Sequence, residues 1–121
     1  MLFRSPAELV VVGKPRPGGP TPRLLAELQL NGSVRFVNGL SDPELVSLYA
    51  EADAAVVPSL YEGFSLPAVE AMSTGICLVA TTGGALPEVV GPDGRNALTV
   101  PPGDPSALAG AIGRVDRKSV V

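Results

Sequence analysis

The chain has 121 residues, of which 45% are hydrophobic, 17% charged and 4% aromatic, so it is long enough for one small globular domain. Nine Lys and Arg residues against twelve Asp and Glu residues give a formal net charge of -3 with no basic run, which argues against nucleic acid as a partner. The absence of His excludes catalytic arrangements built on imidazole, and the single Cys77 excludes an internal disulfide and indicates a reducing, cytoplasmic setting.

Short apolar runs alternate with helix-starting prolines along the chain. Runs rich in β-branched and apolar residues predict strands at 8–12, 34–37, 54–57, 77–80 and 97–100. Between and after them the sequence predicts helices at 22–30, 41–52, 65–74 and 104–112, and a short helix or turn at 86–90. This alternation indicates an α/β fold, a doubly wound parallel sheet covered by helices on both faces. Cys77 is expected to be a small buried residue at a strand start.

The longest uncharged stretch and the two ends of the chain bear on membrane insertion and on domain boundaries. Residues 71–87 are interrupted by Ser, Thr and Gly and fall short of the roughly 20 apolar residues that cross a bilayer, so no transmembrane segment is predicted. Residues 2–5 and 116–121 can be encoded by the two complementary strands of one short oligonucleotide that resembles a sequencing adapter. We therefore expect one partial domain at 6–115, a piece of a longer protein, with foreign tails at 1–5 and 116–121.

The loops that follow the strands are the expected ligand-binding segments, because ligands of open α/β sheets gather beyond the carboxyl ends of the strands. The first loop imitates a phosphate-binding loop in its glycine spacing, but Gly19-Pro20 stands where Lys and Ser or Thr would be needed. Lys14 and Arg16 of that loop are expected to be solvated. No G-x-G-x-x-G occurs anywhere, so the dinucleotide-binding fingerprint is absent.

The loop after the third strand carries the strongest signal. Glu62 and Glu70 are eight positions apart, with Gly63 and Ser65 allowing close approach of the backbone to a ligand. A carboxylate one turn into the helix can accept two hydrogen bonds from a vicinal diol such as a ribose, and Glu62 can do the same for sugar hydroxyls. The first turn of that helix favours a phosphate, and Gly83-Gly84 offers a second close-approach backbone.

Each of these residues also has an ordinary structural interpretation. Taken alone, Glu62 and Glu70 would be solvated charges. Ser65 is first of all a helix cap, and Phe64 would either pack beneath its loop or touch a ligand. Turn geometry with positive φ explains three glycines as readily as ligand contact does: Gly63, Gly83 and Gly84.

A block of matched motifs surrounds the two glutamates. The run EGFSLPAVEAMSTG, preceded by VPS and followed by TTGGALPEVV, resembles the C-terminal, nucleotide-sugar-binding half of retaining GT-B glycosyltransferases of family 4. The segments VRFVNGLSDPELVSLYAEADAAVVPS and NALTVPPGDPSAL resemble the same family, so the likeness covers nearly all of residues 6–115.

The resemblance implies a role for each residue of the motif. Glu62 would contact the donor sugar at the reaction face, and Glu70 would hold the ribose. Sugar and diphosphate would be held by backbone groups of the intervening residues, Gly63, Phe64, Ser65 and Leu66. The donor would be a UDP-, GDP- or ADP-sugar, with no metal and no other cofactor.

The chain departs from the family's pattern in several places. The usual EGFG is EGFS here, and Cys77 replaces a proline that is common after the helix. The Arg and Lys that neutralise the diphosphate in this family come from upstream of the first strand, and the acceptor is bound by an N-terminal domain. We expect both to be missing from this chain, which would then catalyse little by itself.

The expected activity belongs to the parent protein, which would transfer a hexose from a nucleoside diphosphate sugar to an acceptor hydroxyl. Peripheral contact of the parent with a membrane is left open. Two other interpretations remain at this point. A GT-B sugar-nucleotide epimerase or glycan synthase domain would share the motifs, and a non-catalytic flavodoxin-like binding module would share the alternation of strands and helices.

Overall fold

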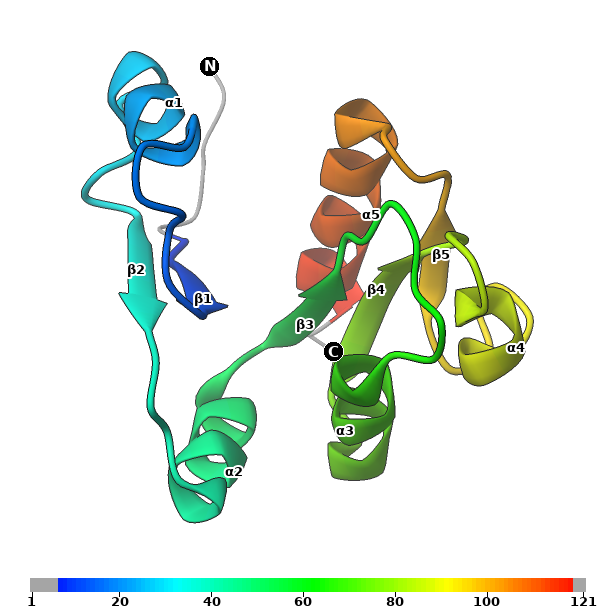
Figure 1. Ribbon diagram of the computed structural model, residues 1–121. Coiled ribbons are helices and arrows are strands. Elements are labelled where there is room, and N and C mark those ends of the chain that lie inside the picture. The colour runs from blue at the N-terminus through cyan, green and yellow to red at the C-terminus, as the bar shows by residue number, and fades with distance from the viewer. Residues whose placement is uncertain (1–6, 119–121) are drawn as a thin grey trace. The chain divides into compact units, whose positions relative to one another are not determined.

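The computed structural model describes residues 7–118, and Figure 1 shows the order of their helices and strands. Strand and helix alternate throughout, as predicted, in the order β1 (Leu9–Val12), α1 (Thr21–Glu27), β2 (Val34–Val37), α2 (Asp42–Glu51), β3 (Ala54–Val57), α3 (Leu66–Thr74), β4 (Cys77–Thr81), α4 (Leu86–Val90), β5 (Leu98–Val100) and α5 (Pro105–Lys118). Every strand pair is parallel, which confirms the α/β class. The expected tail at 1–5 and the last three residues of the expected tail at 116–121 lie outside the described residues, whereas 116–118 belong to α5.

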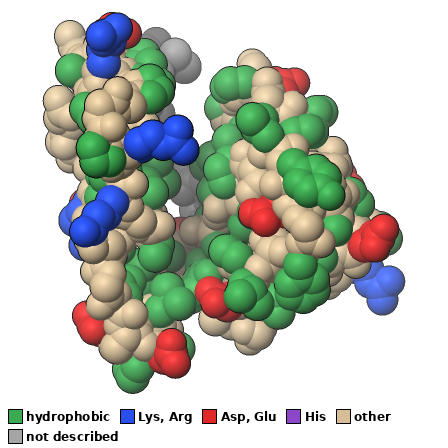
Figure 2. Space-filling view, in the orientation of Figure 1, with side chains coloured by type: hydrophobic (Ala, Val, Ile, Leu, Met, Phe, Trp, Pro, Cys, Tyr) green, Lys and Arg blue, Asp and Glu red, His purple; other side chains and the backbone are tan. Residues whose placement is uncertain are grey.

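The chain divides into two units, residues 1–43 and 44–121. In the first unit β1 and β2 pair in parallel, with Leu9 opposite Val34 and Val12 opposite Val37. No residue between 7 and 43 is buried, because two four-residue strands and one seven-residue helix have too little surface to enclose a core. Lys14 and Arg16 are exposed, and Figure 2 shows basic side chains on the visible surface of this unit.

The second unit is built on a three-stranded parallel sheet in the order β3-β4-β5. Helices α3 and α4 pack on one face of this sheet and α5 packs on the other, so the sheet is covered on both sides (Figure 1). Alternate residues of β4 face opposite ways, and each face has its own core. Leu78 and Ala80 join the cluster beneath α3 and α4, whereas Val79 joins the cluster beneath α5.

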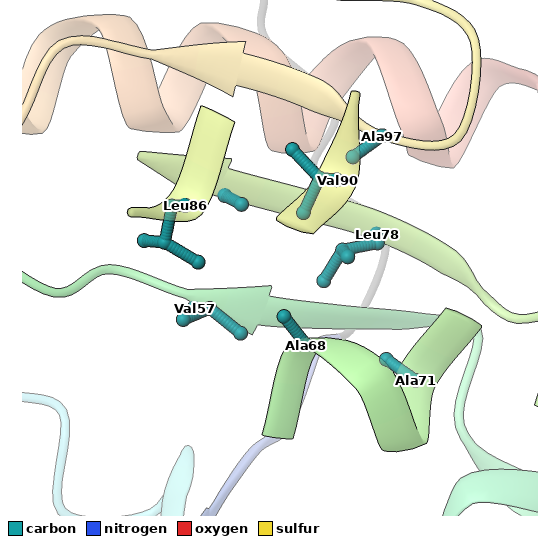
Figure 3. Close-up of a cluster of buried hydrophobic side chains, with 8 residues drawn as sticks. Val57, Ala68, Ala71, Leu78, Leu86, Val90 and Ala97 are labelled. Carbon is teal, nitrogen blue, oxygen red and sulfur yellow. The ribbon is translucent and has the colours of Figure 1, made fainter. Parts of the chain in front are cut away.

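The cluster beneath α3 and α4 is the larger core. Its side chains come from β3, β4, α3, α4 and the residue before β5, and Figure 3 shows them converging. Its buried members are Val57, Ala68, Ala71, Leu78, Ala80, Leu86, Val90 and Ala97. Small residues on α3, Ala68 and Ala71, are fully buried and let the helix approach the sheet closely. This core holds the start of α3 against the carboxyl ends of β3 and β4.

The structure differs from the sequence predictions in how far some elements extend. Helix α5 continues past the predicted end at residue 112 to Lys118, because one interior glycine, Gly113, costs only about 1 kcal/mol and Val115 beyond it is buried. Helix α1 ends at Glu27 rather than residue 30, and Gln29 beyond it has a φ of 57°. The expectation of a buried Cys77 is wrong, since this residue stands at the very start of β4 and is exposed.

Leu86 tests the larger core, because its side chain is fully buried between α4 and the sheet. We expect Leu86→Ala to lower the free energy of unfolding by about 2–5 kcal/mol, through lost apolar contacts and the cavity left behind. Urea titration followed by circular dichroism measures this change. The matched control is Val46→Ala, whose side chain is 61% exposed and should change stability by less than about 0.5 kcal/mol. Equal losses in the two variants would contradict the proposed core.

Candidate functional site

Two neighbouring loops lie at the carboxyl end of the second unit's sheet. Residues 58–65, here called the glutamate loop, connect β3 to α3, and residues 82–85, here called the glycine loop, connect β4 to α4. The backbone N–H of Ala85 donates to the carbonyl oxygen of Glu62 at 2.8 Å, and the Thr81 hydroxyl donates to the carbonyl oxygen of Ser59 at 2.5 Å. The first bond joins the two loops, and the second ties the glutamate loop to the last residue of β4.

The glycines of the glycine loop make this contact sterically possible. A Cβ atom on Gly83 would lie 2.5 Å from the carbonyl oxygen of Leu60, and one on Gly84 would overlap the carbonyl oxygen of Glu62. Gly84 also has a φ of +59°. Both glycines are therefore required by the packing of the two loops. Gly63 differs from them, because a Cβ atom there would meet no atom within 4 Å.

The Glu62 side chain is half-buried and held by its own loop. The Ser59 hydroxyl donates to Glu62 Oε1 at 2.7 Å. Because the Glu62 backbone is also fixed by Ala85, both ends of this residue are restrained. The sequence prediction named Glu62 but missed Ser59, although Ser59 stands three positions earlier in the quoted VPS motif.

Ser65 caps α3, as the sequence predicted. Its hydroxyl accepts a hydrogen bond from the Ala68 N–H at 3.2 Å, and the residue is 5% exposed. Its φ of 91° lies in the region that glycine occupies readily and other residues avoid. The strained backbone gives a physical reason why EGFG would suit this turn better than EGFS. Since Ala68 N–H is used by the cap and Pro67 has no N–H, Leu66 carries the remaining N–H of the first three helical positions.

Glu70 lies one turn into α3 and is half-buried. The hydroxyl of Tyr49, on α2, donates to Glu70 Oε2 at 3.3 Å. Burial raises the pKa of Tyr49, and the neighbouring carboxylate of Glu70 raises this pKa further by its charge and its hydrogen bond. Tyr49 was not among the predicted site residues. Its position 21 residues before Glu70 gives no local spacing signal, and only the tertiary fold brings its hydroxyl to α3.

Large apolar side chains of the glutamate loop and the start of α3 are exposed. Phe64 is 54% exposed and belongs to neither buried core, so of the two alternatives left open for it, packing beneath the loop does not apply. Three nearby side chains have even larger exposed fractions: Leu60 at 73%, Tyr61 at 76% and Leu66 at 65%. Figure 2 shows apolar side chains gathered on the visible face of this unit. Exposed apolar groups around a polar loop are typical of a surface that binds something.

A shallow hollow of about 230 Å³ lies beside the glutamate loop, lined by residues that include Pro58, Leu60 and Thr81. Sites for drug-sized ligands enclose roughly 300–1,000 Å³, so these residues form one wall of a site rather than an enclosed pocket. A larger hollow of about 570 Å³ lies near the start of β4 and the end of α2. It touches none of the predicted site residues.

Two further features concern residues 7–118 as a whole. No three side chains of His, Cys, Asp or Glu within this range gather as ligands of a metal ion would. None of the helices in the same range has both the length and the apolar character needed to cross a membrane.

The fold and its two loops define an α/β unit with a carboxylate-bearing site at the end of a parallel sheet, and comparison with known proteins identifies its class. The family described as glycosyl transferases group 1 matches residues 2–117. The chain belongs to this family. Its likeness to solved glycosyltransferase structures places the described residues in the GT-B fold class.

Three relatives illustrate the likeness. An MMP alpha-(1->4)-mannosyltransferase of Mycolicibacterium hassiacum is 55% identical over 108 residues, which cover 89% of this chain and 26% of the relative. The sucrose-phosphate synthase of Thermosynechococcus elongatus has a TM-score of 0.82 and 35% identity, covering 93% of this chain and 30% of that one. Anabaena HepE, solved in complex with UDP, has a TM-score of 0.82 and 25% identity, covering 93% and 32%. The chain thus spans about a quarter to a third of these relatives. The alternatives of an epimerase or glycan synthase domain and of a flavodoxin-like module are not favoured.

Two substitutions at Ser65 separate the stabilising effect of its helix cap from the destabilising effect of its positive φ. We expect Ser65→Gly to raise the free energy of unfolding by about 1 kcal/mol, because relief of the positive φ outweighs a lost cap that costs only a few tenths. Ser65→Ala should instead lower it by about 1 kcal/mol, since the cap is lost and the strained backbone stays. Thermal unfolding of both variants measures the difference. A less stable Ser65→Gly would contradict the strain.

Gly84 tests the packing of the two loops. We expect Gly84→Ala to lower the free energy of unfolding by at least about 1–2 kcal/mol, the cost of a side chain in the left-handed region, with more from overlap with Glu62. Gly63→Ala is the matched control, and it should stay within about 0.5 kcal/mol of the wild type because its Cβ meets no neighbour. Urea unfolding of both variants measures the difference. Equal stability of Gly84→Ala and Gly63→Ala would refute the contact.

Proposed function

We propose that this chain is most of the donor-binding domain of a retaining glycosyltransferase of family 4. The parent protein would transfer a hexose from a nucleoside diphosphate sugar to an acceptor hydroxyl, with the acceptor bound by an N-terminal domain. One observation carries the proposal. Two half-buried glutamates, Glu62 and Glu70, flank the start of α3 at the carboxyl end of the sheet, and each accepts a hydrogen bond from a nearby hydroxyl.

Glu62 would bind the donor sugar at the reaction face. Its Oε1 atom accepts from Ser59, and a carboxylate has about four lone-pair positions, so further sites are left for sugar hydroxyls. The bond from Ala85 to its carbonyl oxygen would keep this carboxylate in place as the sugar reacts. Gly63 and the exposed backbone next to it would approach the sugar without steric hindrance.

The start of α3 would contact the diphosphate. Backbone groups of residues 63–66 are the proposed donors, and the positive end of the helix dipole favours a negative charge there. In the proposed reaction the diphosphate departs and the acceptor attacks from the same face, so the main task of the protein is to stabilise the leaving charge. With Ala68 N–H occupied and Pro67 lacking one, this turn alone offers few donors. Cationic side chains from the rest of the parent would supply the remainder.

Glu70 would hold the ribose of the donor. Its position one turn inside α3 places a carboxylate next to the proposed diphosphate position, and a vicinal diol can donate two hydrogen bonds to it. The backbone of Gly83 and Gly84 would line the same site from the glycine loop. The donor class is a UDP-, GDP- or ADP-sugar, and the proposed reaction uses no metal and no other cofactor.

The relatives support this proposal but do not identify the nucleotide base of the donor. The Mycolicibacterium hassiacum relative is named a mannosyltransferase, and mannose is a hexose. The HepE structure contains UDP. We further propose that the parent works in the cytoplasm. This reducing compartment would keep the single Cys77 as a free thiol and would supply the nucleotide sugar.

Titration of the chain with UDP, UDP-glucose and GDP-mannose tests the donor site. We expect saturable but weak amide NMR shifts around the glutamate loop for one base, and a roughly 10- to 100-fold weaker affinity in Glu70→Ala, because hydrogen bonds to a charged group are lost. Glu51→Ala, at the exposed end of α2, is the matched control and should bind as the wild type does. Sugar transfer by the chain alone should be undetectable.

Distinct results would contradict distinct parts of the proposal. A folded chain whose spectrum responds to none of the three ligands would count against a donor site in these residues. Equal binding by wild type and Glu70→Ala would remove the ribose role from Glu70. Measurable sugar transfer by the 121 residues would show that no further domain is needed for catalysis.

A further inference from the structure

We propose that Tyr49 is a positioning residue for the donor site, whose hydroxyl orients the Glu70 carboxylate toward the two hydroxyls of the bound ribose. This inference rests on the proposed function, because it assumes that Glu70 receives a ribose. It adds a residue on α2, outside the motif block that contains the two glutamates. The observation behind it is the hydrogen bond from Tyr49 to Glu70 Oε2 at 3.3 Å.

The ring of Tyr49 is a fixed support for this bond. It is half-buried and packs against the core cluster beneath α3 and α4. Tyr has only two side-chain torsions, so a packed ring holds its hydroxyl in a defined place at little entropic cost. Glu70, by contrast, has a flexible side chain on a helix surface, and its carboxylate would sample several rotamers without a partner. Tyr49 therefore restricts the carboxylate before any ligand arrives.

The hydroxyl has two acceptors within reach but only one hydrogen to donate. Glu70 Oε2 lies at 3.3 Å and the carbonyl oxygen of Pro67 at 3.4 Å. A charged acceptor makes the stronger hydrogen bond, so the carboxylate is favoured. Both acceptors belong to the first five residues of α3, which places the hydroxyl beside the start of the helix where the diphosphate is proposed to bind.

The arrangement leaves Glu70 able to bind a diol. The contact with Tyr49 uses one lone-pair position on one carboxylate oxygen, out of about four on the whole group. Burial and the charge of Glu70 raise the pKa of Tyr49, so its hydroxyl keeps its proton at neutral pH and stays a donor. Tyr49 thus supports the carboxylate without competing for the positions that two ribose hydroxyls require.

The test compares a nucleotide with its analogue lacking both ribose hydroxyls. We expect Tyr49→Phe to weaken binding of UDP, or of GDP if that is the base bound, by roughly 3- to 10-fold. Binding of the matching 2′,3′-dideoxynucleotide should be unchanged, because this ligand has no ribose hydroxyls that could donate to Glu70. A merely structural role would weaken both ligands alike. Amide NMR titration of the full 121-residue chain measures all four affinities.

Matched variants make the result decisive. Ser47→Ala removes an exposed hydroxyl from α2 only two positions before Tyr49, and it should leave both affinities unchanged. In a Glu70→Ala background, Tyr49→Phe should cause no further loss, since the group that it positions is gone. Tyr49→Phe keeps the ring that packs on the core, so its amide spectrum should stay dispersed.

The outcomes separate the two proposals. If the wild type binds and Glu70→Ala weakens binding, but Tyr49→Phe binds as the wild type does, the positioning role is overturned and the donor site stands. An equal loss for nucleotide and dideoxynucleotide, an additive loss in the double variant, or an unfolded Tyr49→Phe would also overturn it in favour of a structural role. If the wild type binds no nucleotide, or Glu70→Ala has no effect, the proposed function fails first.

Discussion

The packing of the glutamate loop onto the glycine loop is the contact on which the candidate site depends. One backbone hydrogen bond, from Ala85 to the Glu62 carbonyl, joins the ends of two neighbouring strands, and it forms only because Gly83 and Gly84 have no side chains. The same contact fixes where α3 begins, since Ser65 must turn through a positive φ to leave the glutamate loop. A strained residue held in place by its surroundings is typical of a functional turn.

Both motif glutamates are oriented by hydroxyl groups from other positions. Ser59 restrains Glu62 from within the same loop, and Tyr49 restrains Glu70 from a different helix. Neutral hydroxyl donors hold a carboxylate without cancelling its charge, so each glutamate keeps its capacity to accept further hydrogen bonds. A cationic partner would compete with the ligand far more strongly. This arrangement suits the recognition of sugar and ribose hydroxyls.

Much of the fold could be predicted because its signals are local. Apolar β-branched runs located all five strands, and prolines near helix starts located α2 to α5. The ends of helices and strands were harder to predict, because they depend on tertiary contacts. Buried Val115 anchors the last turns of α5 beyond Gly113, and Cys77 is exposed because it stands at the outer end of its strand.

By itself, the sequence determined the α/β class and the family and predicted the two glutamates as site residues, because these rest on residue types at short, fixed spacings. Tertiary structure decided what surrounds them. The need for Gly83 and Gly84 comes from a loop that is more than twenty residues away in sequence, and the support of Glu70 by Tyr49 comes from a neighbouring helix. Such contacts follow from how the core packs helices and loops together, and no local spacing encodes them.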